Sequence, residues 1–256
     1  MIRILLHGCN GHIGRMICET AKEDPAAVIA AGVDIDTTRN YDFPVYSSMK
    51  EVPAGTADVI VDFSVAKAVD EVIDYAAETG IPAVVCTTGL SEGQLQKLSE
   101  ASGKAAVLRS ANMALGVNLL LKLAADAAKI LSDKGYDIEI VERHHRRKLD
   151  APSGTALALA DSMNEACGGK FSYCYGRAER HEARPASEIG ISAVRGGTIP
   201  GDHDVIFAGE DEVITLSHTA YSRKIWAKGA LNAAQFLAGK PAGYYTMMDV
   251  IGDALS

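Results

Sequence analysis

A glycine-spaced turn directly after an apolar segment is the feature that most restricts how this chain can fold. Ile2–His7 reads as a short buried strand, and Gly8, Gly11 and Gly14 follow it ahead of a helical segment that extends to about Glu23. Glycine lets the backbone turn tightly beside a pyrophosphate, whose charge the amide groups at the helix start then meet. The pattern predicts a dinucleotide-binding α/β domain, with a purely structural glycine turn as the alternative.

Asp34 indicates which dinucleotide is preferred. It ends the next predicted strand, 20 residues beyond Gly14, where a carboxylate accepts hydrogen bonds from the adenosine ribose hydroxyls. The same carboxylate repels the 2′-phosphate of NADP, and the nearest cation along the chain is Arg39. We therefore predict that NADH is preferred and that NADPH is possible.

The order of the predicted elements divides the chain into two parts. Apolar strands alternate with helices up to about Ala111, as in a parallel sheet covered on both faces, whereas several strands follow one another without helices between Ser172 and His218. We predict an α/β fold: a Rossmann-type parallel-sheet domain formed by residues 1–113 and 223–256, and an inserted α+β domain, residues 114–222, with a mixed or antiparallel open sheet. The first is expected to bind the dinucleotide, the second to bind substrate and to oligomerise.

Composition excludes several classes of protein. Hydrophobic residues make up 48% and charged residues 23% of 256 residues, an ordinary globular balance, and the net charge of −8 argues against a nucleic-acid partner. The most apolar stretch, Leu115–Leu131, is interrupted by polar residues, and the N-terminus lacks the layout of a signal peptide. We expect no membrane association and a cytoplasmic location, in which the five cysteines are reduced and mostly buried.

The run from Arg143 to Lys148 is basic throughout and stands out in an acidic chain. A solvated loop, a nucleic-acid patch and a metal site built on His144 and His145 are alternatives, but aromatic neighbours and further metal ligands at suitable spacing are missing. No metal is therefore predicted. The run is better suited to bind a small anion.

The residues after the basic run support an anion site. Pro152 is expected in the first turn of a helix, where Ser153, Gly154 and Thr155 offer amide and hydroxyl donors. Cations beside a helix N-terminus bind carboxylates or phosphates, and histidine exchanges protons near neutral pH. Together with the cofactor turn, this predicts a reductase of a small anionic substrate.

Residues Glu142–Ala156, which read E-x-H-H-x-x-K-x-D-A-P-S-G-T-A, resemble the signature of the 4-hydroxy-tetrahydrodipicolinate reductase family. The resemblance extends over nearly the whole chain. Its further segments are Gly8–Gly14, Asp62–Ser64, Thr87–Gly89, Ser110–Met113, Gly116–Asn118, Arg195–Gly197 and Ser222–Arg223. It implies reduction of a dicarboxylate in the diaminopimelate route to lysine, and a homotetramer assembled through the sheet of the second domain.

The resemblance also implies a role for individual residues. His144 would be the proton donor and acceptor, and Lys148 a second proton donor. His145, Gly154 and Thr155 would bind substrate carboxylates. The residues implied to bind the cofactor are Gly8, Cys9, Asn10, Gly11, His12, Ile13, Asp34, Cys86, Thr87, Thr88, Ser110, Ala111, Asn112 and Met113.

Three departures from the family pattern concern the cofactor. His12 and Ile13 replace the usual Arg-Met pair, which removes a cation near the adenosine phosphate, while Cys86 replaces a frequent glycine and Met113 a common aromatic residue. Two other functions stay open on the residues alone. They are a reductase of the same fold that acts on another imine or keto acid, as in aspartate dehydrogenase, and a non-catalytic NAD(H)-binding protein.

Overall fold

The computed structural model describes residues 1–178 and 180–253, and the chain divides into two compact units. Met1–Leu115 and Lys224–Ser256 form the first unit, and Gly116–Arg223 form the second. The chain thus leaves the first unit once and returns to it with its C-terminal segment.

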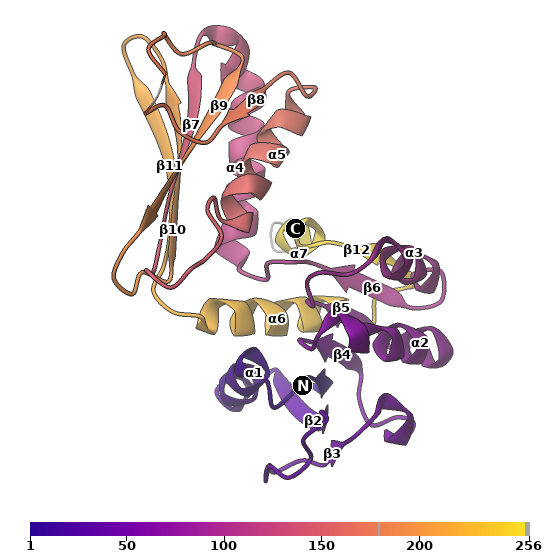
Figure 1. Cartoon of the computed structure of the whole chain (residues 1–256). Coiled ribbons are helices and arrows are strands. Elements are labelled where there is room, and N and C mark those ends of the chain that lie inside the picture. Colours follow the sequence, from indigo (N-terminus) through magenta and orange to yellow (C-terminus); the bar gives the residue numbers. More distant parts are fainter. Residues whose placement is uncertain (179, 254–256) are drawn as a thin grey trace. The chain divides into compact units, whose positions relative to one another are not determined.

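The first unit is built on a seven-stranded parallel sheet (Figure 1). Its strands are β1 (Ile2–His7), β2 (Ala27–Val33), β3 (Val45–Tyr46), β4 (Val59–Asp62), β5 (Ala83–Val85), β6 (Ala106–Arg109) and β12 (Gly243–Tyr245). Their order across the sheet is β12-β6-β5-β4-β1-β2-β3. The predicted Rossmann-type sheet is therefore confirmed.

Helices cover both faces of this sheet, because successive strand residues point to opposite sides. Ile4 and Leu6 of β1 pack with α1, α6 and α7, whereas Leu5 packs with α2 and α3. These helices are α1 (His12–Lys22), α2 (Val69–Thr79), α3 (Glu92–Ala101), α6 (Lys224–Leu237) and α7 (Met247–Asp253), with 3-10 turns η1 (Met49–Glu51) and η2 (Ala66–Ala68). Burial on both sides explains why these strands are continuously apolar in the sequence.

The strand order places the predicted cofactor residues along one edge. β1 lies between β2 and β4, so the chain runs from β1 to β3 in one direction and from β4 to β6 in the other. Loops that leave neighbouring strands in opposite directions open a crevice at their carboxyl ends, where nucleotides bind in sheets of this kind. Gly8 follows β1 and Asp34 follows β2 at this edge.

Three elements of the first unit were not expected from the sequence. β3 has two residues and β12 three, and each pairs with only one neighbour, β2 and β6 respectively. α7 follows β12 directly and buries Met247, Val250 and Ile251. Segments this short carry too few residues for a periodic pattern, so pairing and packing in the folded protein define them.

The second unit is one mixed sheet with two helices on one face (Figure 1). Its strands are β7 (Asp137–His144), β8 (Ser172–Cys174), β9 (Glu188–Arg195), β10 (Gly201–Ala208) and β11 (Val213–Ala220), in the order β11-β10-β7-β9-β8. β10 is antiparallel to β7 and β11, whereas β7, β9 and β8 run parallel. This confirms the predicted mixed sheet.

The helices of the second unit are α4 (Leu115–Leu131) and α5 (Gly154–Ala166), followed after α4 by the turn η3 (Ser132–Lys134). They pack on the face formed by Ile138, Ile140 and their neighbours in β9 and β10. Along β7 half-buried and buried residues alternate strictly, and Glu142 and His144 are the last two buried residues of this pattern. The expected candidate proton donor therefore lies on the helix-covered face at the end of a strand.

Over the described part of the chain, none of the helices combines the length and the hydropathy that a membrane crossing would need.

Candidate active site

The glycine turn brings β1, α1 and the end of β4 into close backbone contact. A Cβ atom placed on Gly8, whose φ is +79°, would lie 2.5 Å from the carbonyl oxygen of Phe63, and one on Gly14 would lie 2.1 Å from the carbonyl oxygen of Gly8. Neither position has room for a side chain. Glycine is thus required at both for α1 to start directly against the turn.

The start of α1 is suited to receive an anion. Its N-cap is Gly11, no side chain caps the helix, and its first turn contains no acidic residue. Backbone amides at such an end carry partial positive charge and lack partners within the helix. The turn and helix start therefore fit a dinucleotide pyrophosphate, as the sequence predicts.

Asp34 lies beside this turn. Its carboxylate accepts a hydrogen bond from the amide of Asn10 at 2.9 Å, which ties the end of β2 to the turn. The hydroxyl of Tyr41 lies 3.0 Å from the side-chain oxygen of Asn10, and the guanidinium of Arg39 lies 5.5 Å from the centre of the Tyr41 ring. The nearest cation in sequence is thus also close to the turn in space.

Four of the residues expected to line the cofactor site have side chains in the core of the first unit. Cys9, Cys86, Thr87 and Met113 are buried, and a Cβ on Gly229 of α6 would lie 1.7 Å from the carbonyl oxygen of Met113. Burial raises the pKa of the Cys9 thiol to about 12 and raises that of Cys86 well above its ordinary value, so both stay protonated. Burial of their side chains leaves mainly backbone atoms of these residues for contact with a ligand.

The segment Ser110–Met113 is attached to α6 by a side-chain contact. The indole nitrogen of Trp226 donates to the side-chain oxygen of Asn112 at 3.1 Å, and the hydroxyl of Ser110 donates to the Asn112 carbonyl at 2.8 Å. Ala111 and Thr88 are exposed. The loops after β5 and β6 therefore present Thr88, Ser110 and Ala111 at the edge where the turn lies.

In the second unit, His144 is held by a buried carboxylate. Nδ1 of His144 lies 2.6 Å from an oxygen of Glu142, and Glu142 also accepts two hydrogen bonds from Arg195, each 2.7 Å long. The Glu142 side chain is fully buried and that of His144 is 10% exposed. Nδ1 is therefore occupied by the carboxylate, and Nε2 is the ring nitrogen left for proton exchange.

Helix α5 begins next to this pair. Ser153 is its N-cap, with its hydroxyl oxygen 3.1 Å from the Ala156 amide, and the Ser153 amide donates to Glu142 at 3.0 Å. Gly154 and Thr155 are the first helical residues, which is where the sequence places a carboxylate site. The expectation for Pro152 was wrong: because the Ser153 side chain caps the helix, Pro152 lies ahead of the cap and outside the first turn.

His145–Lys148 is a turn, with the Lys148 amide donating to the His145 carbonyl at 3.1 Å. The ammonium of Lys148 lies 2.9 Å from Asp150, and hydrogen bonding to Lys148 holds the pKa of Asp150 below its ordinary value. Arg143, the first member of the basic run, instead pairs with Asp204 at 2.7 Å. The basic run is thus divided between a strand and a turn.

Positive charge gathers around His145. Burial and then the charges of Arg147, Arg223, His144 and Lys148 lower the pKa of His145. Its Nδ1 is buried and has no hydrogen-bond partner. A neutral imidazole surrounded by cations donates to a carboxylate without adding another buried charge, so the cluster suits a dianionic ligand.

Two polar groups in these regions were missed by the sequence analysis. His203 of β10 is buried, and its ring centre lies 5.2 Å from that of His144. In the first unit, Nδ1 of His7 lies 2.7 Å from Asp62, both buried, at the ends of β1 and β4. Neither histidine belongs to a recognisable motif; only strand register brings each to its partner.

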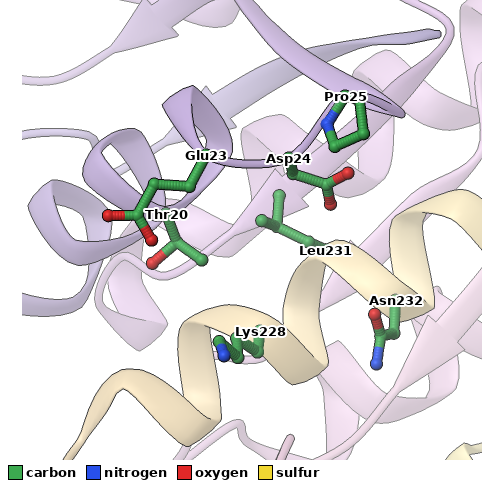
Figure 2. Close-up of a pocket in the computed structure, with 7 residues that line it drawn as sticks. All are labelled: Thr20, Glu23, Asp24, Pro25, Lys228, Leu231 and Asn232. Carbon is green, nitrogen blue, oxygen red and sulfur yellow. The ribbon is translucent and has the colours of Figure 1, made fainter.

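A separate pocket of about 310 Å³ lies between the end of α1 and the middle of α6 (Figure 2). It is lined by Thr20, Glu23, Asp24, Pro25, Lys228, Leu231 and Asn232. None of these is a predicted site residue, and Thr20, the lining residue nearest to the glycine turn along the chain, lies about 14 Å from Gly11 at 1.5 Å per residue of α1. No group of three or more His, Cys, Asp or Glu side chains in residues 1–178 and 180–253 is placed to hold a metal ion.

Models of one protein family match both parts of the chain. The model described as dihydrodipicolinate reductase, N-terminus, matches residues 2–113, and that of the C-terminus matches residues 116–251. The chain belongs to the dihydrodipicolinate reductase family. The family resemblance predicted from the sequence is thereby confirmed.

Relatives of this family align over almost the full length. The 4-hydroxy-tetrahydrodipicolinate reductase of Caldanaerobacter subterraneus subsp. tengcongensis is 53% identical over 98% of both chains, and that of Clostridium tetani is 46% identical over 96% of both. A solved structure, dipicolinate-bound dihydrodipicolinate reductase from Paenisporosarcina sp. TG-14, has a TM-score of 0.82 at 25% identity and covers 96% of this chain and 97% of its own. Both units thus have their counterparts in family members.

Proposed function

We propose that this chain reduces 4-hydroxy-tetrahydrodipicolinate to tetrahydrodipicolinate with a nicotinamide cofactor, in the diaminopimelate route to lysine. One observation carries the proposal: Glu142 joins the His144 ring to the first turn of α5, next to a cluster of cations. A proton donor, an anion-binding helix start and excess positive charge are what reduction of a small dicarboxylate requires. The relative from Paenisporosarcina, whose structure holds dipicolinate, is consistent with this ligand class.

The reaction consumes one hydride and one proton and releases one water. The bound cofactor supplies the hydride, so the chain has to orient the ring, balance the two carboxylates and deliver the proton. We assign the proton to Nε2 of His144, with Lys148 as a second donor. His145 and the Gly154–Thr155 helix start bind the carboxylates, whose negative charge the neighbouring cations offset.

We propose that the first unit binds the cofactor through Gly8–Ile13, Asp34, Cys86–Thr88 and Ser110–Met113. The absence of space for side chains at Gly8 and Gly14 and the uncapped start of α1 support a pyrophosphate at the turn. Asp34 suits free ribose hydroxyls, which favours NADH. Arg39, stacked on Tyr41, provides a nearby cation through which NADPH is tolerated at lower efficiency.

We further propose a homotetramer assembled through the sheet of the second unit. β11 lies at the edge of that sheet, and its Val213 and Ile214 are 61% and 38% exposed. The unpaired backbone groups and apolar side chains of such an edge are a template for pairing with another chain. Light scattering coupled to size-exclusion chromatography measures the mass directly, and a monomer at micromolar concentration would contradict this assembly.

The function is tested by following oxidation of reduced cofactor while the preceding synthase generates the substrate from pyruvate and aspartate semialdehyde. We expect oxidation that depends on the synthase and is more efficient with NADH than with NADPH. Folded protein that binds NADH but oxidises neither cofactor would contradict the reductase. Equal or better efficiency with NADPH would contradict only the assignment of Asp34.

A further inference from the structure

Glu142 is a fully buried carboxylate of the second unit, and it is a non-reacting residue in the function proposed above. Its two oxygens accept four hydrogen bonds: one from His144, two from Arg195 and one from the Ser153 amide. The donors come from β7, β9 and the start of α5. One carboxylate therefore connects the three elements that form the site.

Strand register accounts for this arrangement. Glu142 faces His203 across the β7–β10 ladder, and His144 faces Arg195 across the β7–β9 ladder. Residues two apart along a strand share one face, so Glu142, His144, Arg195 and His203 all lie on the face that α4 and α5 cover. The polar cluster thus continues the hydrophobic core toward the strand ends.

The ionisation of Glu142 follows from its partners. Burial by itself would raise the pKa of this carboxyl group, but hydrogen bonds from Arg195, His144 and the Ser153 amide outweigh burial, so the pKa is lowered. A buried carboxylate is stable only when such donors compensate for its lost hydration. At neutral pH Glu142 is therefore an acceptor only, and it accepts the proton on Nδ1 of His144.

We propose that Glu142 is a positioning residue: it holds a proton on Nδ1 of His144, so that Nε2 is the nitrogen that exchanges protons, and it holds the anion-binding start of α5 in register with that ring. The proposal rests on the function proposed above. Through the bond to His144 it selects the tautomer, and through the bond to Ser153 it sets the place of Gly154 and Thr155. The two oxygens of Glu142 thus fix both the His144 ring and the helix start that is proposed to bind a carboxylate.

The surroundings of His144 support Nε2 as the ring nitrogen that is available for proton exchange. A Cβ on Gly201 of β10 would lie 2.9 Å from Nε2, so glycine at this position leaves that nitrogen uncovered. The other charged or titratable groups facing the ring are His203 from β10, Arg195 from β9, and His145 and Lys148 from the following turn. Burial, and then the charge of His144, lower the pKa of His203 to about 4, so this neighbour is neutral while His144 exchanges its proton.

The test compares Glu142→Gln with Glu139→Gln in the full-length protein. Glu139 lies on the same strand and pairs with Arg177 and Arg184, without contact to His144. In Glu142→Gln we expect turnover to fall by roughly 100-fold or more, as when the carboxylate that orients a catalytic imidazole becomes an amide. The pH profile of the rate should also change, because the ring loses its anionic partner.

A second readout does not require activity. Nitrogen-15 chemical shifts of the imidazoles show which ring nitrogen carries the proton, and His144→Gln identifies the signals of this ring. We expect neutral His144 to carry its proton on Nδ1 in the unmodified protein and in Glu139→Gln, but on Nε2 in Glu142→Gln. Affinity for NADH should be the same in all three, since the predicted cofactor residues belong to the first unit.

The outcomes separate the two proposals. Glu142→Gln that retains the Nδ1 proton, the turnover and the pH profile of the unmodified protein would overturn the positioning role. If that variant does not fold, the nitrogen-15 measurement on the unmodified protein still tests the proposal, because a neutral His144 protonated on Nε2 would contradict the role of Glu142. Unmodified protein without turnover refutes the proposed reaction, and the tautomer measurement then still shows whether Glu142 orients the ring.

Discussion

Replacement of Gly14 by alanine tests whether the glycine turn is the cofactor site. The added Cβ would lie 2.1 Å from the Gly8 carbonyl oxygen and 2.9 Å from the carbonyl carbon and Cα of Cys9. All three are backbone atoms, so no side-chain rotation relieves the overlap. The first turn of α1 must move away from the loop by about 1 Å to restore a normal contact.

A displacement of this size has two measurable costs. Overpacking destabilises a protein by about 1–3 kcal/mol. Because a displacement of about 1 Å is enough to misalign groups that act together, we expect NADH affinity to fall by roughly 10- to 100-fold. Both effects arise at the junction of β1 and α1, so they should appear together.

Trp226 provides the assay. It is the single tryptophan of the chain and donates a hydrogen bond to Asn112, in the loop expected at the nicotinamide end. Quenching of its fluorescence during an NADH titration gives the dissociation constant, and thermal melting gives the change in stability. These measurements need no substrate.

Gly93→Ala is the matched control. This glycine lies in the exposed first turn of α3, and a Cβ there would approach nothing closer than the Ser91 hydroxyl at 4.0 Å. We expect unchanged NADH affinity and a stability gain of up to about 1 kcal/mol from better helix propensity. If Gly14→Ala binds NADH as tightly as Gly93→Ala, the turn is not the pyrophosphate site.

Three further predictions concern single residues. His144→Gln should lower turnover by roughly 100- to 10,000-fold with unchanged NADH affinity, because a proton donor is lost; steady-state kinetics with an unchanged rate would remove His144 from the mechanism. Asp34→Ser should raise the efficiency with NADPH relative to NADH by roughly tenfold, since a negative charge beside the 2′-phosphate is removed, and an unchanged ratio would exclude Asp34 as the determinant. Burial lowers the pKa of His203 from 6.5 to about 4, so the unfolded chain binds a proton at this residue more readily than the folded chain does. The contribution of neutral His203 to the free energy of unfolding is therefore fully present above pH 6.5 and is lost as the pH falls toward 4. Hydrogen exchange in the second unit should show a loss of about 2 kcal/mol between pH 7 and pH 5 that is absent in His203→Asn; equal losses in both proteins would contradict this assignment.

Much of the fold was predictable because local patterns and tertiary structure agree. The strand Ile2–His7 has the predicted bounds. Long apolar or amphipathic segments bury the same face in most contexts, so their periodicity is informative. β7 continues through the charged residues Arg143 and His144, because Arg143 pairs with Asp204 of β10 and His144 lies opposite Arg195 of β9.

The chemistry-bearing residues divide in the same way. Gly8, Gly14, Asp34 and the Ser153–Thr155 helix start were recognisable from the sequence, because each depends on a short stretch of chain with a local requirement for its residue type, whereas the roles of His144 and Lys148 are implied by the resemblance to the family. A tight turn needs glycine, and a helix start needs a cap. Such requirements act over a few residues and leave a visible motif.

Only the tertiary structure decided how His144 is held. Glu142 lies 53 residues from Arg195, and Ser153 lies 50 residues from His203, yet each pair is in hydrogen-bond contact. Strand order and register set these contacts, and they arise from the packing of a whole face against α4 and α5. The sequence by itself predicted which groups would carry the chemistry. The folded sheet decided which nitrogen of His144 is left open, because that depends on the burial of Glu142 and on its bonds to Arg195, which strand order and register set.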